Sequence, residues 1–181
     1  YEMANYLCHD EMLLHNGFQE TLESGAIRFE QLKFFEKRKI GNYVVIPLPG
    51  RHFGSVETRS ANYLFQLPEG DVLYYGTDTG YYFPDTINFL KEYQINQLIT
   101  ECTWDEKHPC NLETDKHLSL LALRKLLGVL EEQGTLGRFS EVYLTHISHS
   151  HTRSHEELEK LVNNWTEFPF KVCIAYDGMK I

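Results

Sequence analysis

No stretch of the 181-residue sequence approaches the roughly 20 consecutive apolar residues that a helix needs to cross a bilayer. The start of the sequence also lacks the charged and then apolar pattern of a secretion signal. We therefore expect an unsecreted, soluble protein with no membrane partner. Hydrophobic residues make up 42% of the chain, which is enough to bury a core in one compact domain over residues 1–181.

Positive charge is scarce, because 17 Lys and Arg residues stand against 26 Asp and Glu residues, for a net charge of −9. Proteins that bind nucleic acid neutralise phosphates with clustered Lys and Arg side chains. The composition therefore disfavours nucleic acid as a partner. A small anion held by a local positive charge is still compatible with it.

Cysteine is also sparse, and no two cysteines form a CxxC pair. The scattered positions favour a reducing compartment, the cytoplasm, over a disulfide framework. The four residues are Cys8, Cys102, Cys110 and Cys173. The first residue is Tyr1 and not Met, and we interpret the sequence as part of a longer protein.

Hydrophobic periodicity predicts two kinds of organisation along the chain, and no internal repeat is present. A helix is expected over 10–24, with Asp10 as N-cap and Gly25 as its end. Three short runs rich in Val, Ile, Tyr and Phe then predict an antiparallel meander, at 43–49, 61–67 and 71–76. After Gly80 helices alternate with strands: helix 86–93, strand 97–102, helix 115–133, strand 141–147, helix 154–164 and strand 171–177. This order predicts a mixed α/β sheet with helices on an outer face.

Three of the predicted strands deliver a polar residue at their C-terminal ends, in "LYYGTD", "VYLTH" and "CIAYD". Reactive groups gather at the C-terminal edge of α/β sheets, because the sheet is rigid and the loops beyond it can diverge. We therefore expect Asp78, His146 and Asp177 to converge.

Asp78 opens an Asp-Thr-Gly sequence, which also occurs in aspartic proteases. That chemistry needs two carboxylates that share a proton, and this chain has one Asp-Thr-Gly. The protease interpretation is therefore disfavoured. Asp78 is left as a metal ligand or as a residue that ends a strand in a turn.

Four of the nine histidines fall in "THISHSHTRSH", at 146, 149, 151 and 155. Imidazoles with carboxylates nearby suit a hydrolytic divalent-metal site, whereas a solvated loop is the alternative. Ser154 and Glu157 predict a capping box at the start of a helix, so we expect His151 and His155 to belong to such a solvated loop.

Two further histidines stand in favourable places. His52 lies in "PLPGRHFGS", where glycines let the backbone turn the ring inward, although an ordinary surface position is the alternative. His117 lies in "ETDKHLSLLALRKLL", at the start of a predicted amphipathic helix, and exposure in the first turn is its alternative.

Six segments taken in order resemble the metallo-β-lactamase-fold hydrolases: "PGRHFGS", "LYYGTDTG", "LITECTW", "HLSLLALRKLL", "LTHISHSH" and "IAYDGM". The likeness is strongest to the branch with the cyclic phosphodiesterase of phosphonate breakdown, and weaker to the tRNA 3′-processing endonucleases. It extends over about residues 44–181. It implies an αβ/βα sandwich with mixed sheets, of which this chain would be the C-terminal portion.

The resemblance also implies roles for individual residues. His52, Asp78 and His146 would be ligands of two divalent cations, zinc or manganese, with Asp78 bridging them. His117 would donate a proton to the leaving oxygen. His149 matches a position that completes a structural zinc site in some relatives, although the upstream cysteine cluster is missing here. Asp177 would accept a hydrogen bond that orients a ligand or its loop.

The sequence departs from the family pattern in one respect. The HxHxDH segment, which supplies further metal ligands, is absent, and "LCHDEMLLH" does not reproduce it. The chain as given would then hold part of a metal site. We expect a metal-dependent phosphodiesterase acting on a small or cyclic phosphate ester. The alternatives are cleavage of another ester, a thioester, a lactone or RNA, and a non-catalytic binding module. Exposed sheet edges could support a homodimer.

Overall fold

The computed structural model describes residues 18–28, 31–53, 59–148 and 153–181 of the chain. The chain forms two compact units, 1–33 and 34–181. In the first unit, helix α3 (Phe18–Glu23) ends in a turn where the Ser24 N–H donates to the Glu20 carbonyl. Gly25 has φ +74°, which confirms it as the residue that ends this helix. Residues 10–17 of the predicted helix lie outside the described residues.

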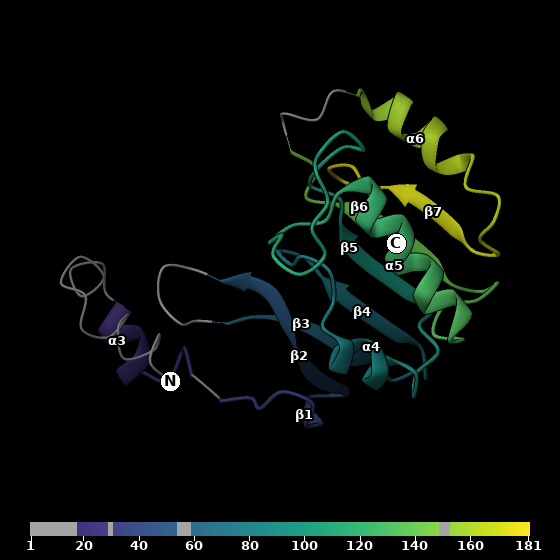
Figure 1. Ribbon diagram of the computed structural model, residues 1–181. Helices are drawn as coiled ribbons and strands as arrows, with labels where there is room; N and C mark the ends of the chain where they lie inside the picture. The colour runs from purple at the N-terminus through teal and green to yellow at the C-terminus, as the bar shows by residue number, and fades with distance from the viewer. Residues whose placement is uncertain (1–17, 29–30, 54–58, 149–152) are drawn as a thin grey trace. The chain divides into compact units, whose positions relative to one another are not determined.

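The second unit holds a seven-stranded sheet whose strands lie in sequence order (Figure 1). Strands β1 to β4 pair antiparallel, and strands β4 to β7 pair parallel. The predicted meander and the mixed sheet are therefore confirmed. The strands are β1 (Arg38–Ile40), β2 (Tyr43–Phe53), β3 (Arg59–Gln66), β4 (Val72–Gly76), β5 (Gln97–Glu101), β6 (Glu141–Thr145) and β7 (Lys171–Ile174).

Three helices follow the meander: α4 (Pro84–Leu90), α5 (Leu120–Glu132) and α6 (His155–Asn163). The capping box predicted for α6 is present, since the Glu157 N–H donates to Ser154 Oγ and the Ser154 N–H donates to the Glu157 carboxylate. Among the described residues, no helix combines the length and the apolar character that crossing a membrane requires.

The predicted start of α5 near residue 115 is wrong, because the helix begins at Leu120. Ser119 is its N-cap and accepts a hydrogen bond from the Ala122 N–H. The backbone at Ser119 is extended, and this residue forms a parallel bridge with Trp104. His117 therefore lies in the loop before the helix and not in its first turn.

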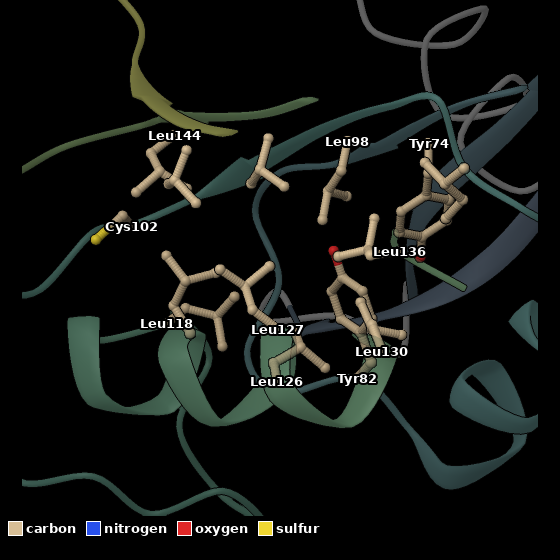
Figure 2. Close-up of a cluster of buried hydrophobic side chains, with 14 of the residues drawn as sticks. Tyr74, Tyr82, Leu98, Cys102, Leu118, Leu126, Leu127, Leu130, Leu136 and Leu144 are labelled. Atoms are coloured by element: carbon tan, nitrogen blue, oxygen red, sulfur yellow. The ribbon is translucent and has the colours of Figure 1, made fainter. Parts of the chain in front are cut away.

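The core lies between α5 and one face of the sheet (Figure 2). Leu126 and Leu127 of α5 are fully buried, and Leu98 and Leu144 of β5 and β6 face them. Close packing of these side chains makes the central strands rigid. The C-terminal ends of β4, β5 and β6 are therefore a fixed edge on which side chains can be placed accurately.

Candidate metal centre

Asp78 and His146 meet at this edge, where β4 and β6 end. Asp78 Oδ1 lies 3.1 Å from His146 Nε2. Both residues have positive φ, +49° for Asp78 and +55° for His146. Residues other than glycine seldom adopt this conformation, and where they do so the surrounding structure must hold it. The two turns aim the side chains at each other, so the structure brings these two residues together as the strand ends predicted.

Two hydrogen bonds of the Arg51 backbone place His52 beside the turn that carries Asp78. The Arg51 N–H donates to Thr79 Oγ1 over 2.8 Å, and the Gly80 N–H donates to the Arg51 carbonyl over 3.1 Å. These two bonds join the end of β2 to the Asp-Thr-Gly turn. His52, Asp78 and His117 each offer a ligand atom, and these atoms all lie within 4.8 Å of one another.

Glycine is required in the Asp-Thr-Gly turn by the loop that leads to His117. A Cβ atom on Gly80 would lie 1.9 Å from the carbonyl oxygen of Asp115. No side chain fits in that space, because the two backbones are in direct contact. The glycine thus lets the loop before α5 reach the Asp78 turn.

Glu101, at the end of β5, is fully buried beneath these residues. Its carboxylate accepts hydrogen bonds from the Thr79 N–H, from the Leu118 N–H over 3.0 Å and from the Thr103 hydroxyl. It also lies 3.0 Å from His117 Nδ1. One buried carboxylate therefore joins the Asp78 turn to the loop that carries His117.

Glu101 was not among the predicted site residues, because charged residues are rarely buried and a glutamate in "LITEC" suggests a surface position. A signal was present nevertheless. Glu101 is the last residue of β5, while Asp78 and His146 come just after β4 and β6. All three parallel strands therefore bring a polar side chain to the same edge of the sheet.

Three imidazole rings gather above Glu101. The His117 ring centroid lies 4.9 Å from that of His52 and 5.3 Å from that of His146, with which it is stacked at 15°. Because Glu101 engages Nδ1 of His117, Nε2 is the ring atom that remains for a substrate or a cation. The arrangement can therefore offer a proton-carrying nitrogen next to potential metal ligands.

Two groups among the described residues could hold a metal ion: His52, Asp78 and His117, and Glu101, His117 and His146. In the second group both Glu101 oxygens already accept hydrogen bonds from protein donors. The side chains of Asp78 and His146 are 56% and 42% exposed and can be reached from solvent. The side of the cluster where Asp78 and His146 lie 3.1 Å apart is thus open to a cation. Imidazole nitrogens with a carboxylate oxygen are a donor set that fits zinc or manganese.

Of the remaining predicted residues, Asp177 is described by the structure. Asp177 is exposed in a turn after β7 and belongs to neither of the two groups. His149 lies outside the described residues. Cys102, next to Glu101, is buried, and burial, with a contribution from the Glu101 charge, raises the pKa of its thiol to about 12. This thiol is therefore neutral at ordinary pH and does not supply a nucleophile.

No protein-family model and no curated protein sequence matches the chain. Solved structures do match it. The metallo-β-lactamase fold protein YhfI from Bacillus subtilis matches with a TM-score of 0.60 at 18% identity, over 87% of this chain and 58% of that one. Unliganded yeast PDE1 matches with a TM-score of 0.63 at 17% identity, over 86% and 50%. A diphosphatase from the PhnP family matches with a TM-score of 0.58 at 22% identity, over 94% and 54%.

These matches establish the class of fold. The chain has the metallo-β-lactamase fold, as the sequence resemblance implied, and spans between 50% and 58% of the length of these three structures. The identities are too low to carry an activity from those proteins to this one. The activity has to be argued from the side chains at the sheet edge.

Proposed function

We propose that this protein is a metal-dependent hydrolase of the phosphodiesterase type, which cleaves a small or cyclic phosphate ester. The observation that carries the proposal is the meeting of Asp78 and His146 beside two further histidine rings, one of which is backed by a buried carboxylate. A structure named as a diphosphatase shares the fold, which supports cleavage of a phosphate compound. A cytoplasmic location belongs to the same proposal.

His52, Asp78 and His146 would hold two divalent cations, zinc or manganese, together with ligands from any further part of the polypeptide. Such cations polarise phosphoryl oxygens and activate water for attack on phosphorus. They also explain how a chain with a net charge of −9 would accept an anionic substrate.

His117 would act as the general acid. In a ring with a proton on each nitrogen, the Nδ1–H group would donate its hydrogen bond to Glu101. Nε2 of the same ring would then give its proton to the departing oxygen. General acid catalysis of this kind contributes on the order of 10²- to 10⁴-fold to a rate.

The test separates metal binding from proton transfer in the full-length protein. Asp78→Ala and His146→Ala should each lose bound metal together with hydrolysis of bis(p-nitrophenyl) phosphate. His117→Ala should keep its metal and slow turnover by about 10²-fold or more. His155→Ala on α6, whose ring lies 3.4 Å from Glu159, is the matched histidine control and should leave both measurements unchanged.

The same variants also show which results would contradict the proposed metal centre or the proposed reaction. Full hydrolysis by Asp78→Ala would overturn the proposed metal centre. Rapid cleavage of a thioester or lactone that does not depend on His117 would assign carbonyl chemistry to the site instead. A full-length protein that binds no metal would be a non-catalytic module.

A further inference from the structure

The hydroxyl group of Thr103 lies at the centre of the hydrogen-bond network beneath the site. Its Oγ1 donates to Glu101 Oε2, lies 2.9 Å from His146 Nδ1 and lies 3.5 Å from His117 Nδ1. Thr103 is 5% exposed, so water does not compete for these contacts.

The proton count on Thr103 fixes the direction of each bond. A threonine hydroxyl carries one proton and two acceptor lone pairs. The Glu101 carboxylate accepts the hydroxyl proton of Thr103, as it accepts the backbone N–H groups of Thr79 and Leu118. The oxygen of Thr103 is then left as an acceptor toward His146, and the proton in that contact must sit on His146 Nδ1.

Asp78 favours the opposite tautomer of the His146 ring. Asp78 Oδ1 lies 3.1 Å from His146 Nε2, and a carboxylate there favours a proton on Nε2. A nitrogen that carries a proton has no lone pair for a metal ion. A neutral His146 ring with no acceptor at Nδ1 would therefore turn its proton toward Asp78 and lose its ability to bind a cation.

We propose that Thr103 is a positioning residue that holds the His146 ring as the Nδ1–H tautomer and so presents the Nε2 lone pair to a divalent cation. Hydrogen bonds from a ligand imidazole to a neighbouring acceptor have this effect in metal proteins generally. The inference rests on the proposed metal centre but not on the hydrolytic reaction, since the tautomer exists before any metal or substrate is bound.

The decisive experiment is ring ¹⁵N NMR on the metal-free protein, at a pH where His146 is neutral. The His146 signals are assigned by their loss in His146→Ala. We expect the Nδ1–H tautomer in the wild-type protein and in Thr103→Ser, and the Nε2–H tautomer in Thr103→Val, which keeps the shape and removes the hydroxyl. Zinc affinity, measured by competition with a chromogenic chelator, should fall on the order of 10- to 100-fold in Thr103→Val and stay within about 3-fold of wild type in Thr103→Ser.

Thr100→Val is the matched control for the loss of a buried hydroxyl. Thr100 is fully buried on β5, and its Oγ1 bonds the Gly76 carbonyl and contacts the Tyr82 hydroxyl, away from the three histidines. It should change neither the tautomer nor the zinc affinity.

A wild-type His146 with its proton on Nε2 would overturn the proposal, and so would a Thr103→Val protein that matches wild type in both measurements. The wild-type spectrum, assigned with the help of His146→Ala, decides the tautomer even if Thr103→Val fails to fold. Loss of hydrolysis with a correct tautomer would instead count against the proposed function alone.

Discussion

His117 Nδ1 lies 3.0 Å from Oε2 of Glu101, whose side chain has no exposed surface. The same carboxylate accepts the backbone N–H groups of Thr79, next to Asp78, and of Leu118, next to His117. A single buried charge thus fixes two loops that are far apart in the sequence. Glu101 is therefore a structural requirement for the site as well as the partner of its proposed acid.

The first prediction concerns Glu101→Gln, which keeps the shape of the side chain and replaces one acceptor oxygen with an NH₂ donor. Whichever way the amide turns, its NH₂ group meets another donor, so we expect a loss of about 1–3 kcal/mol in the free energy of unfolding. Urea denaturation measures it. Glu141→Gln on β6 is the control, because its amide oxygen can still accept from the Tyr143 hydroxyl. Equal losses in the two variants would contradict this account.

The sequence predicted strands β2 to β7, but not β1, and the meeting of Asp78 with His146. The reason is that parallel strands share one C-terminal edge, so polar residues that follow buried runs must arrive close together. The hydrophobic runs that form β4 and β6 were sufficient for that argument. The fold class followed from the same alternation of strands and helices.

Glu101, Thr103 and the start of α5 could not be predicted in the same way. The burial of Glu101 depends on donors from three separate segments, and nothing local in "LITEC" signals them. The helix starts at Leu120 and not near residue 115 because the preceding backbone pairs with Trp104. Tertiary contacts of this kind override local helix propensity.

The second prediction compares two glycines. Gly80→Ala places a Cβ 1.9 Å from the Asp115 carbonyl oxygen, so the loop before α5 has to move. We expect a loss of about 1–3 kcal/mol in unfolding free energy and weaker zinc binding. Gly128→Ala within α5 meets no atom within 4 Å and should instead stabilise the protein by about 0.5–1 kcal/mol. Denaturation of both variants gives the comparison, and a tolerated Gly80→Ala would refute the close approach of the loop.

The third prediction tests the observed start of α5. Ser119 Oγ accepts the Ala122 N–H, so Ser119→Ala removes the N-cap and should lower the free energy of unfolding by about 1 kcal/mol. Thr114→Ala, at an exposed position of the same loop, should change it by less than about 0.5 kcal/mol. A neutral Ser119→Ala would mean that the helix begins earlier, where the sequence first suggested.

The last prediction concerns stability at alkaline pH. Burial raises the pKa of the Cys102 thiol to about 12 in the folded protein, against an ordinary value of 9.0. Between these values the unfolded chain loses the thiol proton and the folded chain keeps it, so the unfolded state binds fewer protons and stability falls as pH rises. Between pH 8 and pH 10 this effect is on the order of 1 kcal/mol, because a difference of one pKa unit is worth roughly that much. Urea unfolding at pH 8, 9 and 10 should therefore show a steeper decline of the free energy of unfolding in wild type than in Cys102→Ala, in which the other alkaline groups still titrate.

Cys110→Ala, at an exposed cysteine, is the control, and its free energy of unfolding should decline as that of wild type does. Parallel curves for wild type and Cys102→Ala would show that the Cys102 thiol is not shielded from solvent.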